Sequence, residues 1–127
     1  MKLAIVMPVY EDWEPAVQVC QRIDLVFSEE PSINASVLFV EDGSRSNACP
    51  KSLSWRPRAL ESVSVLVLRR NLGHQRAIAI GLSYLSEHRT ADAVVVMDSD
   101  GEDRPEDIPR LLAAMSKNGK PTFCRKG

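Results

Sequence analysis

The stretch that determines the fold is ADAVVVMDSDGEDRPED, at residues Ala91–Asp107. Its apolar part, Ala93–Met97, has the length and composition of a buried strand. Pro105 then begins a segment whose apolar residues recur at helical spacing, with Ile108 first. The segment after the strand, up to the start of this helix, holds six acidic residues that are offset by a single arginine: Asp98, Asp100, Glu102, Asp103 and, after Pro105, Glu106 and Asp107. A buried strand that delivers carboxylates at its end is typical of a ligand site in an α/β protein.

The same alternation of strand and helix extends through the chain. Apolar runs predict further strands at Leu3–Met7, Val37–Val40 and Val63–Leu68, and the start of a fifth strand at Pro121–Cys124. Amphipathic spacing predicts helices from about Glu14 to Glu29, after Gly73, and from Pro105 to a stop at Gly119. The polar segment Arg45–Arg58 holds two prolines and is predicted to be a loop with at most a short helix.

Apolar strands that alternate with amphipathic helices predict a Rossmann-like, mostly parallel sheet with helices on both faces. Right-handed crossovers bring the carboxyl ends of all strands to one edge, where open sheets bind ligands. Four polar segments are expected at that edge: Pro8–Asp12, Glu41–Ser46, Arg69–His74 and Asp98–Asp103.

Composition narrows the class of protein. A chain of 127 residues with 44% hydrophobic residues is expected to form a single domain over 1–127. The net charge of −1 argues against a nucleic-acid partner, which usually selects a basic protein. No apolar run approaches the ~20 residues of a membrane span. The three cysteines, Cys20, Cys49 and Cys124, are widely spaced and predict reduced thiols in a cytoplasmic protein.

Alternating carboxylates make Asp98–Glu102 a candidate metal site. Side chains at alternate positions beyond a strand end can turn their oxygens toward one point, and Mg²⁺ or Mn²⁺ prefers oxygen ligands. We expect Asp98 and Asp100 to hold such a cation, rather than to be simple turn residues. For Asp103, Glu106 and Asp107 we expect instead an electrostatic role at the start of the following helix.

The other polar segments leave alternatives open. Asp42 could accept hydrogen bonds from a base or a ribose, or serve an Asp-Gly turn. Tyr10 could stack on a base or be a half-buried residue at the sheet edge. Arg69 and Arg70 could meet a phosphate at a helix N-terminus. His74 is expected to be a structural residue at a helix start.

Taken together, these segments resemble glycosyltransferase family 2, which has the GT-A fold. Four ordered motifs carry the resemblance: MPVYED at Met7–Asp12, VEDGSRS at Val40–Ser46, LRRNLGHQRAIAIGL at Leu68–Leu82 and VVVMDSDGEDRPEDIPRLL at Val94–Leu112. The branch most similar to this chain is that of the dolichyl- or polyprenyl-phosphate sugar synthases.

The resemblance implies an inverting, metal-dependent transfer from a UDP- or GDP-linked sugar to an acceptor. That acceptor could be a polyprenyl phosphate at the cytoplasmic face of a membrane. The cofactor would be Mg²⁺ or Mn²⁺. The implied metal ligands are Asp98, Asp100 and Glu102, although Glu102 stands where the branch often has Gln. The implied nucleotide- and donor-binding residues are Pro8, Tyr10, Asp42, Arg70, Asn71 and Asp98.

Length is the main departure from the family. Its catalytic domain usually continues for roughly another hundred residues, beyond the usual size of one small domain. The chain is therefore expected to be the nucleotide-binding half of a GT-A fold, incomplete at its C-terminus, with Asp103 as a fallback catalytic base. Two other functions stay open: a truncated non-catalytic nucleotide-binding module, and a haloacid-dehalogenase-like phosphatase, whose Asp-x-Asp-Gly turn resembles Asp98–Gly101.

Overall fold

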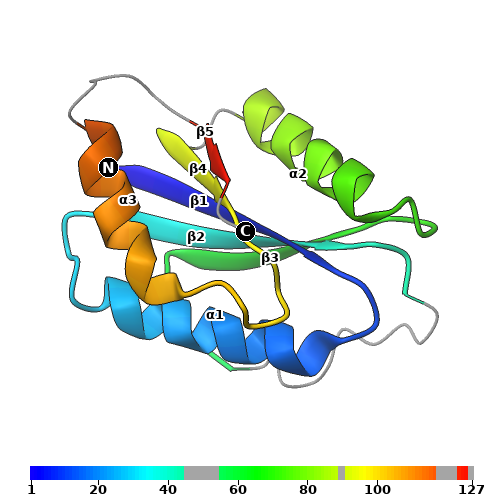
Figure 1. Ribbon diagram of the computed structural model, residues 1–127, viewed down its shortest axis with the longest axis horizontal. Helices are drawn as coiled ribbons and strands as arrows, with labels where there is room; N and C mark the ends of the chain where they lie inside the picture. The colour runs from blue at the N-terminus through cyan, green and yellow to red at the C-terminus, as the bar shows by residue number, and fades with distance from the viewer. Residues whose placement is uncertain (45–54, 89–90, 117–122, 126–127) are drawn as a thin grey trace.

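The computed structural model describes residues 1–44, 55–88, 91–116 and 123–125 (Figure 1). Within these ranges all strands join one parallel sheet in the order β3-β2-β1-β4-β5. The strands are β1 (Lys2–Val9), β2 (Asn34–Glu41), β3 (Ser62–Val67), β4 (Ala93–Val96) and β5 (Phe123–Arg125). The helices are α1 (Trp13–Phe27), α2 (His74–His88), the 3₁₀ turn η2 (Pro105–Asp107) and α3 (Ile108–Ser116).

Helices cover both faces of the sheet, with α1 and α3 on one face and α2 on the other (Figure 1). The alternation of side chains along β1 produces this division, because successive residues of a strand point to opposite faces. Ile5 and Met7 belong to the core beneath α1, whereas Val6 belongs to the core beneath α2. The prediction of a Rossmann-like parallel sheet with helices on both faces is confirmed.

The predicted elements are present, with shifted boundaries. β2 begins at Asn34, three residues before the predicted apolar run, because it pairs with β1 from Lys2 onward. Pro105 begins a 3₁₀ turn that leads into α3 at Ile108, rather than an α-helix directly. The helix stop predicted at Gly119 lies outside the described residues, as does the part of the predicted loop at 45–54.

A crevice is expected between β1 and β4, where the strand order reverses. Pairing between these strands ends at Val6 and Val96, whereas β1 continues beside β2 as far as Val9. The carbonyl groups of Val6 and Pro8 both accept hydrogen bonds from the β4 side, so the N–H that Pro8 lacks would also face that side. Pro8 therefore ends the pairing of β1 with β4, and these two strands separate at the carboxyl edge of the sheet.

A buried carboxylate on α1 fixes the approach to β3. Asp24 is 5% exposed. Its oxygens accept backbone N–H groups from Arg58, Ala59 and Leu60 at 2.8–3.1 Å. Burial acts to raise the pKa of Asp24, but the three N–H donors and the charge of Arg58 outweigh it and hold that pKa below its usual value. Helical periodicity does not reveal this contact, because Asp24 is a charged residue among the buried residues of α1.

Replacing Asp24 by Asn should destabilise the fold by about 1–3 kcal/mol, because an amide group then faces buried N–H donors. Since the folded pKa of Asp24 lies below its unfolded value near 3.8, the ionised carboxylate stabilises the protein above that pH. The difference between wild type and Asp24→Asn should therefore shrink as pH falls below 3.8. Urea denaturation from pH 7 to pH 3 measures it, with the exposed Glu29→Gln as control. A difference that is constant with pH would contradict the assignment.

Candidate functional site

Two adjoining cavities lie at the carboxyl edge of the sheet, where the sequence placed the site. They share the side chains of Pro8, Tyr10 and His74. The first, of about 280 Å³, is completed by Asp12, Asp98, Ser99 and Asp100. The second, of about 220 Å³, is completed by Val9, Asp42, Asn71 and Gly73. Tyr10, which is 42% exposed, borders both cavities and presents its ring to solvent.

The turn after β4 is fixed at three points. The backbone N–H of Asp98 donates to Oδ2 of Asp103 at 3.0 Å. The hydroxyl of Ser99 donates to the Pro8 carbonyl at 2.8 Å, and so joins the turn to β1. Nε2 of His74 lies 2.9 Å from Oδ1 of Asp98. These contacts hold Asp98 at the boundary of the first cavity.

Asp42 joins three segments of the carboxyl edge. Its backbone N–H donates to Val9, at the end of β1. Its carboxylate accepts the N–H groups of Leu72 at 2.8 Å and Gly73 at 3.1 Å, and the amide of Asn71 at 3.2 Å. An ionised carboxylate has about four acceptor positions, so these donors occupy most of its capacity. Asp42 is 3% exposed and fixes the loop that leads into α2.

Close backbone contact makes this arrangement possible. Gly43 has φ of +68°, and a Cβ built on it would lie 2.2 Å from the carbonyl carbon of Arg70. Glu11 has φ of +60°, which is uncommon for a residue other than glycine. Its N–H donates to the hydroxyl of Ser44 at 2.6 Å, which joins the turn after β1 to the turn after β2.

The structure brings together most of the predicted site residues, but not all of them. Arg70 is exposed and lines neither cavity. Glu102 is also absent from both linings, and its backbone N–H donates to Oδ1 of Asp100. In the part of the chain that the structure describes, no three His, Cys, Asp or Glu side chains form a complete metal cluster. The predicted residues that do line the cavities are Pro8, Tyr10, Asp42, Asn71, Asp98 and Asp100.

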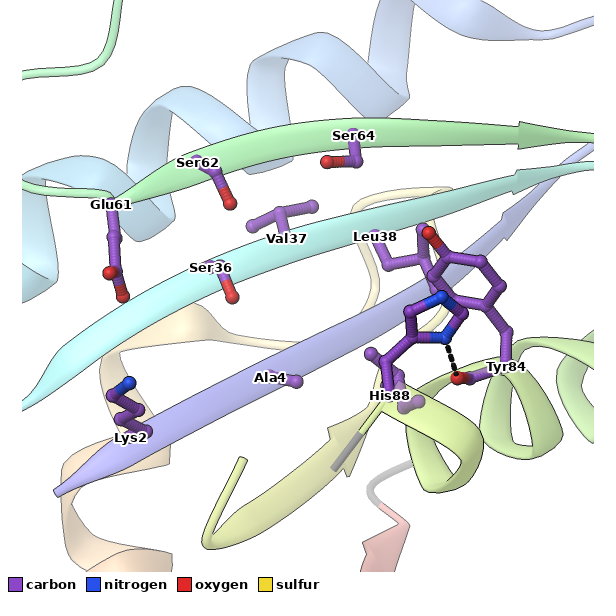
Figure 2. Close-up of a pocket in the computed structure, with 11 residues that line it drawn as sticks. Lys2, Ala4, Ser36, Val37, Leu38, Glu61, Ser62, Ser64, Tyr84 and His88 are labelled. Carbon is purple, nitrogen blue, oxygen red and sulfur yellow. Dashed lines mark hydrogen bonds between the residues drawn. The ribbon is translucent and has the colours of Figure 1, made fainter. Parts of the chain in front are cut away.

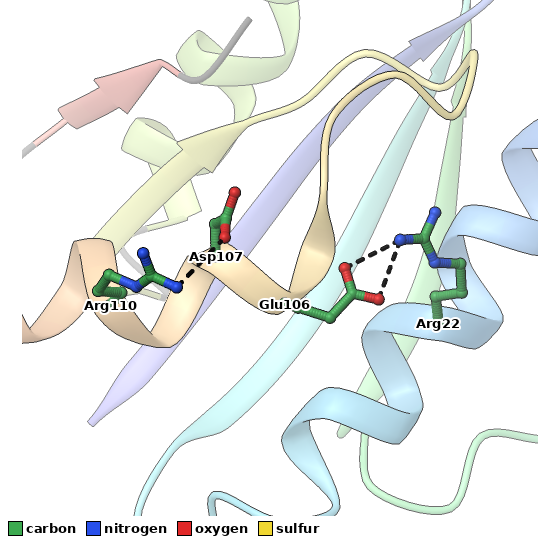
Figure 3. A network of polar contacts seen from close by, with 4 residues as sticks. All are labelled: Arg22, Glu106, Asp107 and Arg110. Carbon is green, nitrogen blue, oxygen red and sulfur yellow. Dashed lines mark hydrogen bonds and ion pairs between the residues drawn. The ribbon is translucent and has the colours of Figure 1, made fainter.

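The acidic residues before α3 have different roles. Asp103, 8% exposed, precedes the helix, and its carboxylate holds the Asp98 turn. Glu106 and Asp107 do lie in the first turn of η2, as expected. Both carboxylate oxygens of Glu106 lie 2.9 Å from Nη2 of Arg22 on α1. Figure 3 shows this pair, and Asp107 beside Arg110. A bond from its own backbone N–H, and then Arg22, hold the pKa of Glu106 below its usual value.

The sequence reading did not assign a site role to His74, Ser99 or Asp12, all of which line the first cavity. His74 was expected to be a helix-start or structural residue rather than a catalytic base. Its position after Gly73, at the first residue of α2, was the available signal. A residue there lies at the carboxyl edge of the sheet together with the strand ends.

A larger cavity of about 340 Å³ lies elsewhere, between the C-terminal end of α2 and the first halves of β1, β2 and β3. Figure 2 shows Tyr84 and His88 of α2 on one side of it, with Ser36 and Ser62 on the sheet opposite. No residue of the acidic turn lines this cavity. Size alone therefore does not identify the functional site, which is marked by convergent polar side chains at the strand ends.

The chain matches the family model for glycosyl transferase family 2 over residues 4–125. The chain belongs to glycosyltransferase family 2. The match begins within β1, extends to the end of β5 and includes the residues that line both cavities. It confirms the family expected from the four sequence motifs, and it implies a nucleotide-sugar donor.

Members of this family generally depend on a divalent metal. Asp98 and Asp100 line the first cavity, and their carboxylates are hard oxygen donors. Mg²⁺ and Mn²⁺ are commonly held by one or two carboxylates together with substrate phosphates and water, so this pair fits as the protein part of such a site.

Among the described residues, no helix is sufficiently long and apolar to cross a membrane.

Replacing Gly43 by Ala should displace the Arg70–Asn71 backbone and destabilise the protein. The matched control is Gly101→Ala, because Gly101 also has positive φ, of +91°, but has no atom within 4 Å of the added Cβ. Both variants lose about 1–2 kcal/mol from the left-handed backbone. Gly43→Ala should lose about 1–3 kcal/mol more from the clash. Equal midpoint shifts in urea would contradict the close approach.

Replacing Glu11 by Asn should stabilise the protein by about 0.5–1 kcal/mol, because Asn tolerates a positive φ better than Glu. The bond to Ser44 uses the backbone N–H and is retained. Asp12→Asn is the control, since it removes one negative charge at a residue with φ of −98°. Denaturation midpoints should rise for Glu11→Asn alone; an equal rise in the control would assign the gain to charge.

Proposed function

We propose that this chain is the donor-binding half of an inverting, metal-dependent glycosyltransferase that uses a nucleoside-diphosphate sugar. The observation that carries the proposal is the adjacency of the two cavities. One contains the carboxylates Asp98 and Asp100, the other contains Asp42 and Asn71, and Tyr10 borders both. A diphosphate with a cation requires the first kind of surface, and a nucleoside requires the second.

The nucleoside is proposed to occupy the cavity between β1 and the loop before α2. Tyr10 is 42% exposed and offers an aromatic ring for a base, and Pro8 lines the same cavity. Asp42 has one remaining acceptor position after its bonds to the loop. An imide N–H of a uracil or guanine edge would suit that position. Asn71 lines the same cavity, whereas Arg70 would reach a donor from outside it.

The diphosphate is proposed to lie in the cavity with the acidic turn. Asp98 and Asp100 would hold Mg²⁺ or Mn²⁺ there, and the bound cation would neutralise charge on the leaving diphosphate. α2 begins at His74 on the same border, and the N–H groups of a helix's first turn favour an anion. Glu102 stays a candidate third ligand, although its side chain lies outside the cavity.

A polyprenyl phosphate at the cytoplasmic face of a membrane is the acceptor that we propose. A hydroxyl acceptor needs a general base, and Asp103 is a poor base because it is 8% exposed and bonded to the Asp98 backbone. A phosphate acceptor is already an anion and can attack without one. This choice also follows the polyprenyl-phosphate sugar synthase branch that the motifs resemble.

A non-catalytic nucleotide-binding module remains the second candidate, because both cavities offer groups that could bind a nucleotide whereas the buried Asp103 is a poor base. Such a module would bind nucleotide without sugar transfer. The phosphatase hypothesis is disfavoured by membership of glycosyltransferase family 2, since its support was a single Asp-x-Asp-Gly turn.

Calorimetric titration with UDP and GDP, with and without Mn²⁺, tests the proposed donor site. One of the two nucleotides should bind, and Mn²⁺ should increase its affinity about 10-fold or more, or about 1.4 kcal/mol. Asp100→Ala should abolish the effect of Mn²⁺ because it removes a cavity carboxylate.

Glu102→Ala is the matched control for that titration, since Glu102 lies two residues away but outside the cavity. It should retain most of the Mn²⁺ effect, and an equal loss would make Glu102 a ligand. If Mn²⁺ did not change the nucleotide affinity of the folded wild type, that result would count against the proposed function.

A further inference from the structure

His74 occupies the border between the two cavities and contributes to both linings. It is the first residue of α2, and its ring reaches across to the turn after β4. Nε2 lies 2.9 Å from Oδ1 of Asp98, with the two side chains 46% and 33% exposed. This contact links a helix start to a proposed metal ligand, and neither periodicity nor the family match assigns it a role.

The main chain and the side chain of Asp98 are held by different partners. Asp103 binds the Asp98 backbone N–H, and Ser99 binds the Pro8 carbonyl, so these bonds fix the path of the turn. Neither bond fixes the rotation of the Asp98 carboxylate. Within the described ranges, the contact that the structure records for that carboxylate is the one with His74.

We infer that His74 is a positioning residue for Asp98. An Nε2–H group that donates to Oδ1 fixes the carboxylate plane and leaves Oδ2 for a cation in the cavity shared with Asp100. Carboxylates that ligate metals are themselves held by hydrogen bonds, and loss of such a partner typically weakens metal affinity by about 10–100-fold. The inference rests on the proposed metal site, and it assigns His74 to the preparation of that site before donor arrives.

Mn²⁺ titration of the 127-residue chain without nucleotide, followed by electron paramagnetic resonance, tests this role. His74→Ala should weaken Mn²⁺ binding about 10–100-fold. His74→Gln should recover most of the loss, because the Gln amide places an N–H donor near the position of Nε2. The control is His88→Ala, since His88 ends the same helix and bonds to the Tyr84 carbonyl far from the turn; its Mn²⁺ affinity should equal that of wild type.

Two further measurements separate positioning from other roles. Electron spin-echo modulation of bound Mn²⁺ should show no ¹⁴N coupling from His74, because the ring contacts the carboxylate and not the cation; such coupling would make His74 a ligand and overturn the inference. Nucleotide affinity without Mn²⁺ should be unchanged in His74→Ala. If His74→Ala lost nucleotide affinity without Mn²⁺ but kept normal Mn²⁺ affinity, His74 would instead be a phosphate contact.

The outcomes also separate this inference from the proposed function. Equal Mn²⁺ affinity in wild type and a folded His74→Ala, with thermal unfolding as the check of folding, overturns the positioning role alone. Absence of Mn²⁺ binding in wild type, with and without UDP or GDP, overturns the metal site and the positioning role together. Weakened binding in both His74→Ala and His74→Gln would also count against donation by Nε2–H.

Discussion

The carboxyl edge of this protein depends on the carboxylate of Asp42. It stands directly after β2, and its backbone N–H bonds to the end of β1. Its side chain accepts the N–H groups of Leu72 and Gly73, and so fixes the loop that leads into α2. Because a helix is rigid, fixing its first turn also fixes His74 against the turn after β4. One buried carboxylate, with most of its acceptor positions filled, therefore sets the relative position of three strand ends.

The acidic residues divide into two groups by burial. Glu41, Asp42 and Asp103 are each at most 8% exposed, and each accepts hydrogen bonds from the chain itself. A buried charge is tolerable when its acceptor positions are filled in this way. Asp98 and Asp100 are more exposed and line a cavity, so their oxygens are accessible to a ligand. Burial separates Glu41 and Asp103, whose carboxylates hold the chain, from the more exposed Asp98 and Asp100. Asp42 combines burial with a proposed contact to the base of the donor.

Much of the fold could be predicted from the sequence because the strands are nearly continuous apolar runs. Ala93–Met97 is the strongest case, since β4 forms at Ala93–Val96. The hydrogen bonds that the backbone of residues 58–60 donates to Asp24 could not be predicted, because they join parts of the chain more than 30 residues apart. The strained backbone at Glu11 was likewise hidden, as nothing in the residue type suggests a positive φ.

Most residues of the candidate site could be predicted from the sequence, but the role of each residue could not. The sequence by itself determined the parallel α/β fold, the edge at which the polar segments meet, and membership of glycosyltransferase family 2. Local patterns suffice for these, since strand ends and crossover handedness follow from short-range chemistry. Tertiary structure decided that Asp42 and Asp103 are buried acceptors, that Glu102 lies outside the cavity, and that His74 meets Asp98. Those facts depend on which donors distant segments bring to each carboxylate, and that is settled when the sheet assembles.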